Sequence, residues 1–228
     1  MLAHLRERYP DLTIENVSGG GNRLDLGMLR YSDAAWMDDR TTPSLKVRHN
    51  IQGLSAVFPP AYLMSFVIAD RDEPLHDSPD LPHIFRSRMA GILGLGFRTG
   101  EFAEDEIDDM RRWINAYKAL RDGLTAASGT LLTPQASFGS GPAWDVFQTT
   151  PEGFQSIVLW AFQTDRAVRR TVVRPRGLRA DSLYDVQSSN HGSLGIMTGV
   201  SLMDDGVELV ASPLSAADTV FLDRVRSR

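Results

Sequence analysis

The chain has 228 residues, 42% of them hydrophobic and 23% charged, which is enough apolar material to bury a full core. Its formal net charge of -5 argues against a nucleic-acid partner, because phosphate binding needs clustered Lys and Arg side chains. The absence of cysteine excludes disulfides and thiolate metal sites.

Two further classes are disfavoured by simple patterns. The five histidines show no His-x-x-x-His spacing, so we expect neither a metal nor a cofactor. No apolar run approaches the roughly 20 residues of a membrane helix, and the amphipathic N-terminus lacks a secretory signal pattern. We therefore expect a cytoplasmic protein without a membrane partner, and the composition leaves a homo-oligomer open.

The first half of the sequence alternates apolar runs with helical periodicities. This order is typical of parallel β/α units. The run 62–69 is nearly continuous in apolar residues and predicts a strand covered on both faces. The predicted elements are, in chain order, helix 2–9, strand 12–17, strand 34–37, a helix after Thr42-Pro43 with Leu45, His49 and Leu54 on one face, strand 62–69, helix 83–95, strand 94–98 and helix 103–124.

The pattern changes after this last helix. Short β-rich runs separated by turn residues predict an antiparallel sheet, at 154–162, 167–173, 182–186, 206–211 and 219–222. We therefore divide the chain into residues 1–127 and residues 128–228. Four β/α units are too few to close an eight-stranded barrel, so the first part reads as a portion of a larger sheet.

The stretch 15–42 contains the residues that are best suited to bind or react with a ligand. Three consecutive glycines follow a β-branched run, which is typical of a loop at a strand end that approaches a ligand closely. After them come Arg23, then an apolar run ending in Trp36, then two adjacent carboxylates, Asp38 and Asp39. An aromatic face next to acids indicates a sugar site.

Each of these features also has a structural interpretation. The glycines can serve as a tight strand-to-helix connection, and either acid can cap the following helix. Trp36 can pack in the core, and Arg23 can pair with Asp25. A nucleotide-binding loop is disfavoured, because neither Gly-x-Gly-x-x-Gly nor Gly-Lys-Ser/Thr is present.

The motifs together resemble a known family. The series Glu-Asn-x-Ser-Gly-Gly-Gly-Asn-Arg-x-Asp-x-Gly-Met-Leu at 15–29, followed by Trp-x-Asp-Asp at 36–39, is similar to the α-galactosidases of glycoside hydrolase family 36, the melibiases. The likeness continues at Ile51-Gln52, Phe58-Pro59-Pro60, Gly94-Leu95-Gly96, Tyr117-Lys118-x-x-Arg121 and Leu202-Met203-x-x-Gly206.

This resemblance implies a retaining hydrolase of terminal α-D-galactosyl residues. Its fold would be α/β plus all-β: the C-terminal half of a (β/α)8 TIM barrel in residues 1–127 and an antiparallel β-sandwich in residues 128–228. Asp39 takes the position of the family's acid/base, and Asp38, which replaces a serine, is the alternative. The substrate-binding positions implied are Asn16, Gly19, Gly20, Arg23 and Trp36, with an α-galactoside oligosaccharide as partner.

One element of the family pattern is absent from these 228 residues. The nucleophile of the family lies in a Lys-Trp-Asp motif, and this sequence contains none. A retaining glycosidase needs two carboxyl groups, so we expect the chain alone to be inactive. The alternatives are a non-catalytic carbohydrate-binding half-barrel, or a related α-glycosidase with another sugar specificity, because Asn16 replaces a cysteine and Phe66 replaces a frequent histidine.

Overall fold

The computed structural model describes residues 1–135, 142–153 and 156–225. The elements of the first half are α1 (Leu2–Arg8), β1 (Glu15–Asn16), α2 (Leu26–Leu29), β2 (Ala34–Trp36), α3 (Ser44–Leu54), η1 (Pro60–Tyr62), β3 (Leu63–Ile68), α4 (Leu81–Met89), β4 (Ile92–Gly96), η2 (Thr99–Glu101) and α5 (Glu104–Leu124). Those of the second half are β5 (Ser128–Leu131), β6 (Trp144–Thr150), β7 (Ser156–Gln163), β8 (Arg170–Val173), β9 (Leu183–Ser188), β10 (Gly192–Thr198), α6 (Gly199–Asp204), β11 (Val207–Val210) and β12 (Ala217–Arg224).

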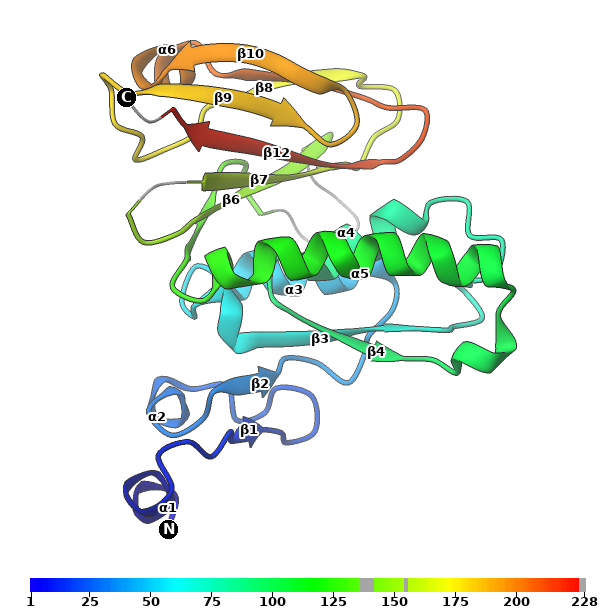
Figure 1. Ribbon diagram of the computed structural model, residues 1–228, viewed down its shortest axis with the longest axis vertical. Helices are drawn as coiled ribbons and strands as arrows, with labels where there is room; N and C mark the ends of the chain where they lie inside the picture. Colours follow the sequence, from blue (N-terminus) through cyan, green and yellow to red (C-terminus); the bar gives the residue numbers. More distant parts are fainter. Residues whose placement is uncertain (136–141, 154–155, 226–228) are drawn as a thin grey trace.

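The four strands of the first half form one parallel sheet in the order β1-β2-β3-β4. Residues of β3 alternate in burial. The odd-numbered ones, among them Leu63 and Val67, are buried against the helices, whereas the even-numbered ones, among them Phe66, are half-buried on the opposite face. The prediction of a strand covered on both faces was therefore wrong, because the described helices α3, α4 and α5 all lie on one side of the sheet (Figure 1).

The helices differ from the predicted ones in face and length. The buried face of α3 is formed by Val47, Arg48, Ile51 and Gln52, while Leu45 is 37% exposed, so the predicted apolar face was wrong. Helix α4 ends at Met89, because the chain at Gly91 packs against the start of β3. A Cβ added to Gly91 would lie 2.3 Å from Leu63 O. Helix α5 confirms the prediction of a helix at 103–124. No helix in the described part of the chain has both the length and the hydropathy to cross a bilayer.

The second half contains the predicted antiparallel strands and several that the sequence did not reveal; the first two residues of the strand predicted at 154–162 lie outside the described residues. A six-stranded antiparallel sheet has the order β10-β9-β12-β7-β6-β5, and β11 pairs with β8 in a separate two-stranded sheet. A core cluster joins the two sheets, with Trp144 and Leu159 on one and Val207 and Leu209 on the other. Strands β5, β6 and β10 and helix α6 were missed.

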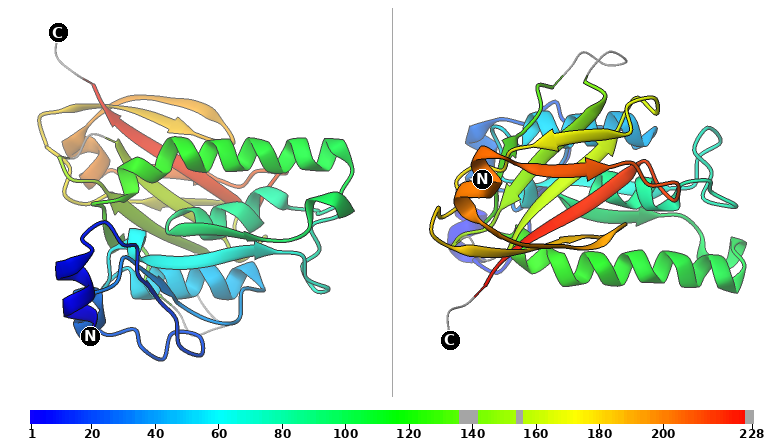
Figure 2. Two further views of the ribbon diagram at one scale, coloured as in Figure 1. Left: turned by 60° about the horizontal axis from the view of Figure 1, so that its bottom comes forward. Right: turned by 90° about the horizontal axis from the view of Figure 1, so that it is seen from above.

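A single hydrophobic core joins the helices to both neighbouring layers. The helices contribute Phe85 and Met89, and the six-stranded sheet contributes Phe147, Trp160 and Phe162. The helices therefore bury one side on the parallel sheet and the other on the antiparallel sheet. Seen from above in the right-hand view of Figure 2, the antiparallel strands lie in front and the parallel sheet lies behind them.

Asp80 connects α4 to the segment before β12. Its carboxylate accepts hydrogen bonds from His83 N at 3.0 Å, which caps α4, from Ser215 Oγ at 2.6 Å and from Ala216 N at 2.7 Å. Loss of a helix cap costs about 1 kcal/mol and loss of hydrogen bonds to a charged group about 1.5–3 kcal/mol. We expect Asp80→Ala to lower the free energy of unfolding by about 2–4 kcal/mol in urea titrations.

The control is Asp108→Ala, which removes an exposed carboxylate of α5 that pairs with exposed Arg111. This variant is expected to stay within about 0.5 kcal/mol of the parent. Equal stability of the two variants would contradict a role for Asp80 in joining the layers.

Candidate functional site

The glycine turn after β1 lies directly against the segment after β2. Gly19, Gly20 and Gly21 have φ values of 50°, 67° and 88°, a backbone region that other residues rarely adopt. A Cβ added to Gly20 would lie 2.5 Å from Asp39 N, and one added to Gly21 would lie 2.4 Å from Met37 O. The main chains at Gly20 and Asp39 are therefore in contact, so the structure brings these two predicted site residues together.

Asn16 shapes this turn from within the fold. Its side chain is buried, and Nδ2 donates to Arg23 O at 2.8 Å and lies 3.4 Å from Tyr62 Oη. The Asn16 side-chain amide therefore links the two ends of the glycine turn, from β1 to the main chain at Arg23. Tyr62 was not singled out in the sequence, where the apolar run 62–69 indicated only a strand.

The Arg23 side chain is exposed and makes no hydrogen bond or ion pair with the residues that the structure describes. It does not pair with Asp25, because the Asp25 carboxylate caps α2 by accepting from Met28 N at 2.9 Å. A guanidinium presented at the rim of the turn offers several donors to a polyhydroxylated ligand.

Trp36 ends β2 and belongs to an aromatic pair on the half-buried face of the sheet. Its ring centroid lies 4.4 Å from that of Phe66, and its Nε1 donates to Asp38 O at 2.8 Å. Phe66 fits because β4 has a glycine beside it: an added Cβ on Gly94 would lie 2.4 Å from the Phe66 ring. The indole is thus fixed to the loop that carries the two acids.

Asp38 is held by three donors. Its Oδ2 lies 2.9 Å from Lys46 Nζ and accepts from Asn50 Nδ2 at 2.9 Å, and its Oδ1 accepts from Arg40 N at 2.9 Å. Burial by itself raises the pKa of Asp38, but these donors together outweigh it and leave the pKa below its usual value. Asp38 is therefore a charged anchor between this loop and helix α3.

Asp39 differs from Asp38 in its exposure and in its contacts. Its side chain is exposed, and among the described residues no donor contacts its carboxylate. An acid that is free of fixed partners can both give and take a proton, whereas one held ionised by a lysine cannot readily do so. In the described part of the chain no three His, Asp or Glu side chains gather as a metal-binding group.

The comparisons with known proteins agree on one family. The family model described as Melibiase matches residues 1–127. The bifunctional α-galactosidase/sucrose kinase AgaSK of Mediterraneibacter gnavus is 27% identical over 212 residues, which cover 91% of this chain and 22% of that protein. The α-galactosidase Mel36A of Lactobacillus acidophilus is 30% identical over 148 residues, which cover 63% of this chain and 19% of that protein.

Solved structures match the fold over nearly the whole chain. The galactosidase domain of AgaSK superimposes with a TM-score of 0.81 at 22% identity, over 98% of this chain and 30% of that one. The α-galactosidase AgaA of Geobacillus stearothermophilus, solved with raffinose, gives a TM-score of 0.80 at 21% identity, over 98% and 30%. The chain thus spans less than a third of the length of these relatives.

The contact between Gly20 and Asp39 predicts the effect of a methyl group at this position. In Gly20→Ala the side chain meets both an unfavourable positive φ, worth about 1–2 kcal/mol, and the Asp39 main chain. Gly192→Ala is the matched control, because Gly192 has φ 75° and open space around it. We expect Gly20→Ala to lose at least about 1 kcal/mol more stability than Gly192→Ala and to shift the Asp39 amide resonance. Equal losses with an unmoved resonance would contradict this contact.

The lowered pKa of Asp38 predicts a pH-dependent stability. Because the folded state favours the ionised carboxyl, its contribution is present above the unfolded pKa of about 3.9 and is lost as pH falls through the lower folded pKa. Asp38→Asn should therefore be less stable than the parent in urea at pH 7, and the difference should shrink toward pH 3. In Asp39→Asn, the control, stability at pH 7 should change by less than about 0.5 kcal/mol. A difference for Asp38→Asn that persists unchanged at pH 3 would contradict the ionic anchor.

Proposed function

Because the chain belongs to the melibiase family, we propose that it is part of a retaining α-galactosidase that hydrolyses terminal α-D-galactosyl residues of oligosaccharides. The observation that carries the proposal is the exposed Asp39 carboxyl, placed at the end of a parallel strand and against the glycine turn. The raffinose bound to the relative AgaA supports raffinose-type oligosaccharides as the substrate class.

The architecture proposed follows the same family. We propose that residues 1–127 form the C-terminal half of a (β/α)8 barrel and that residues 128–228 form an antiparallel β-sandwich domain. The support is the parallel order β1-β2-β3-β4 with intervening helices on one face, and the core cluster that joins the two antiparallel sheets. In such barrels the catalytic groups stand at the C-terminal ends of strands, which is the position of Asp39 after β2.

In the proposed mechanism Asp39 works as the acid/base. It first protonates the glycosidic oxygen while a second carboxylate attacks the anomeric carbon, and it then takes a proton from the water that releases the sugar. The second carboxylate must lie about 5–5.5 Å from the first. Since the sequence lacks a Lys-Trp-Asp motif, we propose that the nucleophile comes from residues outside these 228.

Asp38 is the weaker candidate for this role. An acid must be protonated before the first step, and the Lys46 ammonium at 2.9 Å favours the ionised form of Asp38. Its other oxygen is occupied by the Arg40 N–H. We therefore assign Asp38 the task of orienting the loop.

The proposed sugar contacts divide between direct and supporting residues. Arg23 offers sugar hydroxyls a guanidinium that has no partner in the described part of the chain, and Trp36 offers an aromatic face to the pyranose ring. Gly19 and Gly20 let the main chain approach the sugar. Asn16 acts through the turn, because its amide is already bonded to Arg23 O.

The second candidate is a half-barrel that binds carbohydrate without catalysis, and the missing Lys-Trp-Asp motif favours it. A Lys-Trp-Asp strand end encoded upstream in the same reading frame would support the enzyme. Its absence, together with galactoside binding but no hydrolysis, would support the binding protein. A changed sugar preference, suggested by Asn16 and Phe66, would appear as faster hydrolysis of another α-glycoside.

The assignment of Asp39 is tested in the longest polypeptide encoded in frame with this chain. Loss of a general acid/base lowers rates by about 10²–10⁴-fold, so Asp39→Asn should reduce raffinose hydrolysis by at least about 100-fold with unchanged folding by circular dichroism. Asp38→Asn is the matched control and should lose less. The 228-residue chain by itself should not turn over an aryl α-galactoside. A larger loss in Asp38→Asn would move the acid/base role to Asp38.

A further inference from the structure

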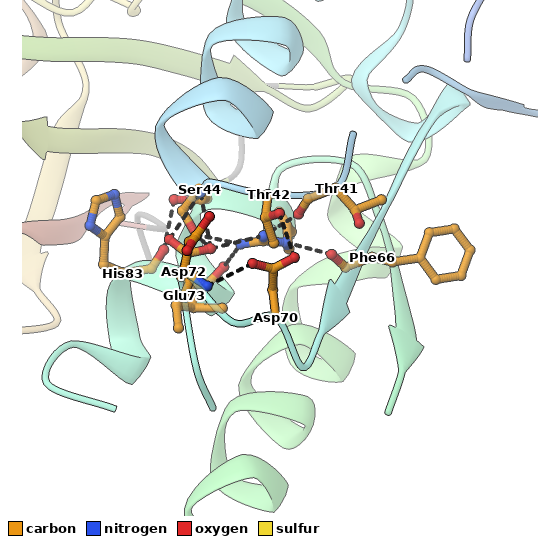
Figure 3. Close-up of polar contacts among 11 residues, drawn as sticks. Thr41, Thr42, Ser44, Phe66, Asp70, Asp72, Glu73 and His83 are labelled. Carbon is orange, nitrogen blue, oxygen red and sulfur yellow. Dashed lines mark hydrogen bonds and ion pairs between the residues drawn. The ribbon is translucent and has the colours of Figure 1, made fainter. Parts of the chain in front are cut away.

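Arg88 of α4 is a fully buried arginine that reaches the loop carrying Asp39. Its Nη2 donates to Thr41 O at 2.6 Å, two residues beyond Asp39. Its Nε donates to Phe66 O at 2.7 Å, and Phe66 is the residue whose ring packs on Trp36. One guanidinium therefore joins the segment that follows β2 to strand β3, and Figure 3 labels the two residues that accept from it, Thr41 and Phe66.

Glu73, from the loop after β3, completes this network. Pro43 stands at the N-cap of α3 and gives no capping side chain, and Glu73 takes over that task from outside the helix. Its two oxygens each lie 3.0 Å from Ser44 N, and Oε2 also accepts from Ser44 Oγ at 2.8 Å. Arg88 Nη1 donates to the same Ser44 Oγ at 2.6 Å.

The Asp39 loop is thus fixed at both ends, at its start to α3 and at its end to α4 and the loop after β3. At its start Asp38 is bonded to Lys46 and Asn50 of α3, and at its end Ser44, the first residue of α3, is bonded to Glu73 and Arg88. Asp39 stands between the two anchors with Gly20 against its main chain. A reactive group needs this kind of support, because an error of about 1 Å in its position can cost 10²-fold in rate.

Packing alone does not account for Arg88. A buried ion pair often stabilises no better than apolar residues of the same volume, so the fold could be held with fewer charges. The helix offers an internal comparison in Arg86, which is also buried but donates to Ala217 O and Asn190 Oδ1 of the antiparallel part. The two arginines therefore serve different parts of the molecule.

We propose that Arg88 and Glu73 are positioning residues that set the place of the Asp39 carboxyl relative to the aromatic pair Trp36–Phe66. Neither touches the reacting atoms, and the proposal rests on the function proposed above for Asp39. Two independent experiments follow, one on the loop and one on the reaction.

The first experiment measures amide hydrogen exchange by NMR in the 228-residue chain. The Arg40 and Ser44 amides report on the loop, because they are bonded to Asp38 Oδ1 and to Glu73. The Asn190 amide, bonded to Ser188 Oγ, reports on the antiparallel part. In Arg88→Met we expect the exchange rates of the Arg40 and Ser44 amides to rise at least tenfold, while that of the Asn190 amide stays unchanged. In Arg86→Met we expect the Asn190 amide to exchange at least tenfold faster, while the Arg40 and Ser44 amides stay unchanged.

Glu73→Gln is the second variant, since loss of a buried arginine can prevent folding. It keeps one acceptor for Ser44 but loses the charge that faces Arg88, so exchange at Ser44 should rise severalfold. Glu208→Gln is its matched control, because Glu208 of β11 pairs with exposed Arg170 of β8 and lies outside the network. Equal exchange in Arg88→Met and Arg86→Met, together with an unchanged Glu73→Gln, would overturn the proposal.

The second experiment separates positioning of an acid from general loss of structure. Raffinose needs a proton on its leaving group, whereas a galactoside of an acidic phenol departs with little help. In the longest in-frame polypeptide, Arg88→Lys and Glu73→Gln should lower kcat/KM for raffinose at least tenfold more than kcat/KM for 4-nitrophenyl α-galactoside. Arg86→Lys should lower both equally. Equal losses in all three variants would overturn the positioning role.

The two experiments also keep this proposal apart from the proposed function. If the loop loosens as expected but Asp39→Asn leaves raffinose hydrolysis unchanged, the assignment of Asp39 fails while the anchoring of its loop stands. If Asp39→Asn abolishes hydrolysis but Arg88→Lys shows no leaving-group dependence, the positioning role fails alone.

Discussion

The candidate site depends on one steric constraint, the contact between two main chains with no side chain between them. Gly20 and Gly21 lie so close to residues 37–39 that any Cβ at either position would overlap a backbone atom of that segment. The positive φ of both glycines turns the chain so that Arg23 follows at the rim. The three-glycine turn therefore sets the main-chain position of Asp39, and it leads into Arg23, whose guanidinium has no partner among the described residues.

Helix α3 transmits the rest of the fold to this contact. Lys46 and Asn50 hold Asp38 from one side of the helix, while Val47, Arg48 and Ile51 on its other side are buried. Arg48 reaches the antiparallel part: it lies 3.3 Å from the Asp145 carboxylate and 5.0 Å from the centre of the Phe162 ring. The antiparallel sheet is thus a support for α3, which explains why the hydrophobic core runs without interruption from one layer to the next.

Much of the fold could be predicted from local sequence patterns, and the errors in the prediction have physical causes. Helix α5 was predictable because its apolar residues recur every three or four positions, and the strand at 62–69 because its apolar run is nearly continuous. The end of α4 was not predictable, because the apolar residues Ile92 and Leu93 fit a helix as well as a strand. In the structure the helix ends before them, where Gly91 packs against the start of β3. The face of α3 was misjudged because its buried side contains Arg48 and Gln52, which periodicity counts as polar.

The residues that surround the site were harder to find from the sequence than the site itself. Asp38, Asp39, Trp36 and the glycines belong to a short motif, and their proximity needs only one strand-to-loop connection. Arg88 and Glu73 lie in other segments, and a lone arginine or glutamate has no distinctive neighbours. The one local signal is that Arg88 follows Ile84 by four residues, so that a charge falls in the apolar stripe of α4.

The difference between the two adjacent acids can be argued from the replacement at position 38. A serine there, as in the family pattern, can form hydrogen bonds but carries no charge, and it offers one oxygen where an aspartate offers two. With Asp38 the loop gains an ion pair to Lys46 in addition to the bonds from Asn50 and Arg40. The anchoring of the loop therefore becomes charge-dependent while Asp39 keeps a carboxyl without fixed partners among the described residues. The two adjacent acids of the sequence thus differ in the structure: one carboxylate holds the loop, and the other is exposed and has no fixed partner among the described residues.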